Sequence, residues 1–104
     1  MIEIDVQVHF YSQLDEAAFF RWAESIPCVK GFDPVTLFIR SKNISKYDLL
    51  DLTALLYRYG AKMEQLRQFC NARNEHWFKD SKKFWYKRVF ANAHIETKNP
   101  ASVK

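Results

Sequence analysis

The first ten residues constrain the fold most, because apolar and polar side chains alternate there without interruption. Apolar residues take every second position and polar residues the positions between them: Ile2, Ile4, Val6, Val8 and Phe10 against Glu3, Asp5, Gln7 and His9. This period of two predicts a β-strand over residues 2–10 with one buried face. Because the other face is polar, we expect an antiparallel or mixed sheet that is open to solvent on one side.

After this strand the apolar residues recur with the period of a helix. A first helix is predicted over about residues 13–25, with Ser12 as its N-cap. A second is predicted over about residues 46–59, where Ser45 begins a capping pattern and Gly60 follows the last turn. Glycine favours the left-handed backbone that commonly ends a helix, so this boundary is well marked.

The remaining segments have weaker patterns. Two strands are expected over residues 28–32 and 35–42, on either side of the turn pair Asp33-Pro34. Two further helices are expected over about 61–72 and 81–91, where large apolar side chains return at helical spacing.

The predicted order of elements is therefore β-α-β-β-α-α-α. It indicates an α+β fold with about three mainly antiparallel strands and with helices packed on one face of the sheet. The length of 104 residues predicts a single domain over residues 1–94 and a flexible C-terminal tail over 95–104. We expect six large side chains in the core: Phe19, Trp22, Leu52, Leu56, Phe69 and Phe84.

The composition favours the cytoplasm. There is no apolar run of the roughly 18 residues that a membrane helix needs, and the N-terminus lacks the basic stretch of a signal peptide. We therefore expect a cytoplasmic protein that makes no contact with a membrane. Cys28 and Cys70 are predicted to be free thiols, buried or half-buried, because disulfides are rare in a reducing compartment.

Charge is distributed unevenly along the chain. The net charge is +4, but residues 1–60 carry six Lys/Arg against eight Asp/Glu, whereas residues 61–104 carry ten against four. A basic half of this kind is typical of proteins that meet an anionic partner, either nucleic acid or an acidic protein surface. The alternative is an ordinary solvated surface.

Three histidines, His9, His76 and His94, are the first residues to consider for catalysis or metal binding. No two of them have the spacing of a ligand pair on a helix, and with only two glycines the chain has no phosphate-binding loop. His76 next to Glu75 could act as a general base, but an ordinary surface histidine is the simpler interpretation. We expect no catalytic site, no metal site and no cofactor.

A basic, aromatic segment near the C-terminus suggests a surface for nucleic acid. Lys83 and Lys87 lie four residues apart on the last predicted helix, with Tyr86 beside them, and Trp77 and Lys79 come shortly before. Lysines neutralise phosphates and aromatic rings stack on bases. The alternative is that most rings are buried and the lysines form a solvated face.

A protein partner is the other hypothesis. Tyrosine, tryptophan and arginine are the residues that most often anchor interfaces. The outer face of the first strand offers Glu3, Asp5 and His9, and the basic segment offers rings and cations. The candidate partner-binding residues are Glu3, Asp5, His9, Trp77, Lys79, Lys83, Tyr86 and Lys87.

The segment between Met63 and Phe90 has a closing pattern of asparagine and aromatic residues: Asn74, Trp77-Phe78, Phe84-Trp85-Tyr86 and Val89-Phe90. This pattern resembles the end of small bacterial proteins, some of which are similar to the cytosolic immunity proteins that accompany polymorphic or contact-dependent toxins. The resemblance implies a non-enzymatic protein that binds one toxin and blocks its active site. A nucleic-acid-binding module that uses the basic segment is the alternative function.

Overall fold

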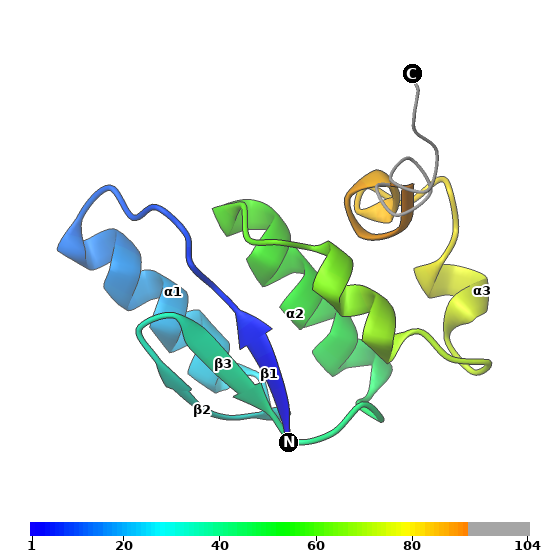
Figure 1. Cartoon of the computed structure of the whole chain (residues 1–104), viewed down its shortest axis with the longest axis horizontal. Coiled ribbons are helices and arrows are strands. Elements are labelled where there is room, and N and C mark those ends of the chain that lie inside the picture. Colours follow the sequence, from blue (N-terminus) through cyan, green and yellow to red (C-terminus); the bar gives the residue numbers. More distant parts are fainter. Residues whose placement is uncertain (92–104) are drawn as a thin grey trace. The chain divides into compact units, whose positions relative to one another are not determined.

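Strand β1 (Ile2–Asp5) is an outer strand of the sheet in the computed structural model, which describes residues 1–91 (Figure 1). Within these residues the sheet has three strands in the order β1-β3-β2, with both pairs antiparallel. Strand β2 covers Val29–Asp33 and the central strand β3 covers Thr36–Ile39. The predicted α+β fold with a mainly antiparallel sheet is therefore confirmed.

The contacts within the chain divide it into two compact units, Met1–Lys62 and Met63–Lys104. The first unit holds the sheet and two helices, α1 (Gln13–Ser25) and α2 (Lys46–Tyr59). The second unit holds short helical segments. The predicted domain end at residue 94, the tail over 95–104 and His94 all lie outside the described residues.

Strand β1 is shorter than the predicted strand over residues 2–10. Ile4 faces Leu37 of β3 and both are fully buried, as the alternation predicts. The last backbone hydrogen bond of this pairing runs from the Val6 N–H to the Val35 carbonyl at 2.9 Å. Beyond that point the partner chain turns back at Asp33-Pro34, so residues 7–10 have no strand to pair with and leave the sheet.

Both helices of the first unit begin and end where the local signals predict. The Ser12 hydroxyl accepts a hydrogen bond from the Asp15 N–H at 3.1 Å, and the Ser45 hydroxyl accepts one from the Asp48 N–H at 3.1 Å. Helix α2 ends at Gly60, whose φ of 74° lies in the left-handed region. Local sequence features, Ser45 and Gly60, therefore define both ends of helix α2.

Aromatic contacts attach helix α1 to its neighbours. The Phe20 ring stacks on the Phe32 ring of β2, with centroids 4.7 Å apart. The preceding residue of the helix, Phe19, is fully buried, and its ring lies edge-on to that of Tyr59 at the end of α2, with centroids 4.9 Å apart. These contacts place α1 on the face of the sheet that also buries Leu37, since Phe32 pairs with Leu37 in the ladder.

The buried Cys28 lies close to Asp48 in the first turn of helix α2. Its thiol donates a hydrogen bond to the carboxylate of Asp48, a buried residue in the first turn of α2. Burial, and then the Asp48 charge, raise the pKa of the Cys28 thiol to about 12. Cys70 is half-buried, and partial burial also raises the pKa of its thiol. The prediction of two free thiols is confirmed.

The second unit differs from its predicted structure. A 3₁₀-helix, η1 (Glu64–Phe69), replaces the predicted helix over 61–72. In place of the predicted helix over 81–91, the chain has turns followed by a π-helix, η2 (Lys87–Ala91). A short helix α3 (Glu75–Phe78) lies in a segment with no regular pattern. Both helix predictions in this unit are therefore wrong in type and in extent.

Side chains that compete with the backbone explain these differences. The Asn74 carboxamide donates to the Phe69 carbonyl at 2.8 Å and accepts from the Asn71 N–H at 2.8 Å, which ends η1 and turns the chain. The Asp80 carboxylate accepts from the Lys82 N–H at 2.9 Å, so Asp80 makes a tight turn instead of starting a helix. Trp85 is buried, and its indole N–H donates to the Phe78 carbonyl at 2.7 Å.

The predicted core is largely confirmed. Phe19, Leu52, Leu56 and Phe69 are at most 1% exposed, whereas Trp22 is half-buried. Phe84 is the exception, because it is 56% exposed. With the predicted helix replaced by turns, Trp85 and Phe78 occupy the interior in its place: Phe78 is fully buried and Trp85 is 4% exposed.

We predict that Gly60→Ala lowers the free energy of unfolding by about 1–2 kcal/mol, because a Cβ is disfavoured at this positive φ. Gly31→Ala is the matched control: an added Cβ meets nothing within 4 Å at either position, but Gly31 lacks the positive φ. Urea unfolding of the two variants measures the difference. Equal stabilities would contradict the role given to the left-handed turn.

We predict that iodoacetamide at about pH 8 labels Cys70 and leaves Cys28 unlabelled in the folded protein. The thiolate is the reactive form, and the raised pKa and full burial of Cys28 keep its thiol protonated and covered. Mass spectrometry should show one label in buffer and a second after unfolding in guanidinium. In Cys70→Ser the folded protein should take up none, and rapid labelling there would contradict the buried thiol.

Candidate functional site

The candidate residues fall into two groups that the structure describes separately. Glu3, Asp5 and His9 belong to the first unit. The other candidates belong to the second unit: Trp77, Lys79, Lys83, Tyr86 and Lys87. Each group is therefore assessed within its own unit.

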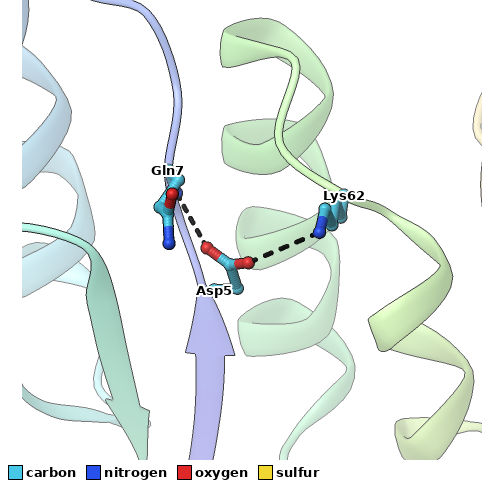
Figure 2. Close-up of polar contacts among 3 residues, drawn as sticks. All are labelled: Asp5, Gln7 and Lys62. Atoms are coloured by element: carbon cyan, nitrogen blue, oxygen red, sulfur yellow. Dashed lines mark hydrogen bonds and ion pairs between the residues drawn. The ribbon is translucent and has the colours of Figure 1, made fainter.

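Glu3 and Asp5 lie on the open face of strand β1. Glu3 is exposed and faces Phe38 of β3 in the ladder. The Asp5 carboxylate accepts from the Gln7 N–H at 3.0 Å and lies 3.8 Å from the Lys62 ammonium (Figure 2). Because both charged groups are exposed to solvent, this ion pair adds little stability, and it partly neutralises the predicted acidic strip.

His9 lies away from that strip, since β1 ends at Asp5. Its ring is edge-on to the Tyr11 ring, with centroids 4.6 Å apart. Both rings line an open groove of about 570 Å³, which forms between the β1–α1 connection and the end of helix α2. The groove is lined by His9, Tyr11, Asp15, Tyr57, Arg58, Tyr59 and Gly60. Of these residues, only His9 was predicted as a candidate.

Two backbone features build the groove. The left-handed Gly60 ends helix α2 just after Tyr57, Arg58 and Tyr59, so three long side chains project from one short stretch. On the other wall, the Ser12 cap starts helix α1 directly after Tyr11. The groove therefore lies where the end of one helix meets the beginning of another.

Tyr59 forms the fixed part of the groove. Its ring lies edge-on to the buried Phe19 at 4.9 Å and to Phe10 at 6.1 Å. Tyr11, by contrast, is 86% exposed, and its only described ring contact is with His9. One tyrosine is thus held by the core, and another stands in solvent at the rim.

The two formally charged residues of the groove, Asp15 and Arg58, differ in whether their charged groups bond to another part of the described chain. Asp15 sits in the first turn of α1, where the helix dipole favours a negative charge, and its carboxylate accepts from the Tyr11 N–H at 3.0 Å. The guanidinium of Arg58 is exposed and makes no hydrogen bond or ion pair with another residue in the described part of the chain. Within the described residues, the groove therefore contains an arginine without an ion-pair or hydrogen-bond partner, among three tyrosine rings.

In the second unit, most of the candidate rings serve an aromatic cluster. Trp77 and Tyr86 are half-buried, with Trp77 edge-on to Trp85 at 6.3 Å and Tyr86 beside Phe90 at 5.7 Å. The Lys79 ammonium lies over the Phe90 ring, 5.7 Å from its centroid. These three candidates thus contribute to packing within the unit.

Lys83 and Lys87 are exposed but do not share a helix face. Lys83 lies in a turn and Lys87 begins η2, so the predicted pair at one-turn spacing is wrong. The exposed ring in this region is Phe84, edge-on to Trp85 at 4.9 Å, which the sequence assigned to the core. Exposed lysines on either side of it make this the part of the second unit best suited to an anionic partner.

No family model, curated protein or solved structure matches this chain. Among residues 1–91, no group of three or more His, Cys, Asp or Glu side chains is placed to hold a metal ion. No helix in the same range is long and apolar enough to cross a membrane.

We predict that Tyr59→Ala lowers the free energy of unfolding by about 2 kcal/mol, because it removes a half-buried ring from Phe10 and Phe19. Tyr11→Ala is the control and should change stability by less than about 0.5 kcal/mol, since Tyr11 is 86% exposed. Thermal and urea unfolding measure both. Equal effects would contradict the division into a fixed and a free tyrosine.

Proposed function

We propose that this chain is a small non-enzymatic binding protein of the cytoplasm, of the type that neutralises a partner toxin, and that it binds its partner through the groove of the first unit. The observation that carries the proposal is the lining of this groove. Three tyrosines, an arginine and a histidine surround a concavity, and tyrosine and arginine are enriched at the energetic centres of protein interfaces.

The surroundings of the groove support a protein partner. A stable interface covers roughly 800 Å² on each side, more than the groove alone supplies. Leu14 is 82% exposed and precedes the groove residue Asp15 in the first turn of α1, so apolar surface is also exposed outside the groove lining. Protein interfaces concentrate aromatic residues and arginine at the centre of the contact and place polar residues at its rim, and the groove supplies such aromatic side chains.

Nucleic acid is a second candidate partner, and Phe84 is the observation that favours it. This ring is 56% exposed and has exposed lysines nearby in sequence: Lys82, Lys83 and Lys87. A base can stack on such a ring while the lysines neutralise phosphates. Binding of this kind would weaken steeply with salt and would depend on Phe84, not on the groove.

We predict that co-expression of this chain restores growth to cells that express the toxin domain encoded by its neighbouring gene. Tyr11→Ala and Arg58→Gln should reduce this protection, because both remove groove side chains that contribute little to folding. Phe84→Ala is the matched control and should retain it. Colony counts on an inducer series measure the effect.

Two results would count against this function. If cells that express the neighbouring gene alone stay healthy, its product is not a toxin and the toxin-neutralising function is contradicted. Loss of protection in Phe84→Ala, with Tyr11→Ala and Arg58→Gln fully protective, would move the binding surface to the second unit. Nuclease treatment of the purified complex then shows whether nucleic acid joins the two proteins.

A further inference from the structure

Arg58 is the feature of the groove that the proposed function leaves unexplained. It lies in the last turn of helix α2, where a cation interacts favourably with the helix dipole. Two carbonyls of its last turn accept backbone hydrogen bonds: that of Tyr57 from the Gly60 N–H and that of Leu56 from the Ala61 N–H, the latter at 3.0 Å. Among residues 1–91, the Arg58 guanidinium makes no hydrogen bond or ion pair, so its donors are available to a ligand there.

The acidic side chain in the groove lining, Asp15, forms no ion pair with Arg58 within residues 1–91. Asp15 lines the same concavity, but its carboxylate accepts from the Tyr11 N–H at 3.0 Å and lies at the N-terminal turn of α1. Both features hold the negative charge toward the backbone. His9 adds a further ring nitrogen to the groove, on the same wall as Tyr11.

We infer that the groove receives an extended segment of the partner protein that carries a carboxylate next to an apolar side chain. The carboxylate pairs with Arg58, whose planar guanidinium can donate two parallel hydrogen bonds to it. The apolar side chain lies against the rings of Tyr11 and Tyr57. This inference rests on the proposed function, because it names the part of the protein partner that the groove would bind.

The charge of the first unit limits how acidic this segment can be. Residues 1–62 carry seven basic against eight acidic side chains, so a long anionic run would meet slightly more negative than positive charge on this unit and would be weakly repelled. A nucleic acid would meet the same repulsion, since its repeated phosphates need several cations and the groove supplies one arginine. One or two carboxylates within an apolar segment match a single guanidinium among tyrosines.

The test uses a defined peptide as the probe. The ¹⁵N-labelled full chain is titrated with the peptide Ac-Ala-Leu-Glu-Leu-Ala-NH₂ and with its Gln counterpart, and amide shifts are followed by NMR. We expect saturable shifts at the amides of Tyr11, Arg58 and Gly60, and affinity about tenfold weaker for the Gln peptide, as for loss of a charged hydrogen bond.

Variants then assign the preference for glutamate to one side chain. Arg58→Gln should bind both peptides equally and about as weakly as the unchanged protein binds the Gln peptide. Arg21→Gln is the matched control, because it removes an exposed arginine of helix α1 that does not line the groove, and it should keep the tenfold preference. The ¹⁵N spectrum of each variant confirms that it is folded.

Three outcomes would overturn the inference: shifts that cluster outside the groove, equal binding of the Glu and Gln peptides by the unchanged protein, or a short oligothymidine that shifts the groove amides more strongly than the peptide. The peptide comparison on the unchanged protein does not depend on any variant folding. If the chain fails to protect cells but Arg58 still gives a preference for the Glu peptide, the toxin proposal is wrong and the inference about the groove stands. If the chain protects cells but binds the Glu and Gln peptides equally, only the inference about the carboxylate-bearing segment is wrong.

Discussion

The first unit depends on the packing of Phe19. This fully buried ring contacts Phe10 at 5.4 Å, Phe20 at 4.9 Å and Tyr59 at 4.9 Å. It therefore joins the β1–α1 connection, helix α1 and the end of helix α2, while Phe20 continues the contact to Phe32 of the sheet. Each aromatic pair adds about 0.5–1.5 kcal/mol beyond the burial of its area, so several pairs at one ring are a large share of a small unit's stability.

The same packing positions the groove. Tyr59 is held by Phe19 and Phe10, and the neighbouring Tyr57 and Arg58 are carried with it on the last turn of α2. The left-handed Gly60 turns the chain away immediately afterwards, which leaves these side chains at the edge of a concavity. Core stability and the shape of the candidate site therefore rest on one group of aromatic contacts.

The sequence predicts the first unit well because its signals are local. Ser12, Ser45 and Gly60 act within one turn of the helix that each begins or ends, and the alternation at β1 needs only a neighbouring strand. The groove could not be predicted in the same way, because residues 9–15 and 57–60 meet only in the folded chain. The run Tyr57-Arg58-Tyr59 before a terminating glycine is the local signal that the sequence offers for this site.

The second unit shows what happens when tertiary contacts outweigh local periodicity. Trp85 has helical spacing to its neighbours, but its buried indole N–H needs an acceptor and finds one in the Phe78 carbonyl. Arg67 likewise donates to the Val89 carbonyl at 2.6 Å across 22 residues of sequence, an interaction that no pattern within one helix can indicate. Irregular segments joined by side-chain hydrogen bonds are the result.

These contacts also separate two kinds of aromatic residue that the sequence cannot tell apart. In the second unit Phe78 and Trp85 are buried, and Trp77 and Tyr86 pack against them or against Phe90, so interleaving with lysines there mostly reflects a core with a solvated rim. In the first unit Tyr11 stays exposed beside an arginine that has no described partner. Folding within residues 1–91 does not account for an exposed ring beside a cation that has no partner there, and this contrast supports the groove as the proposed binding surface.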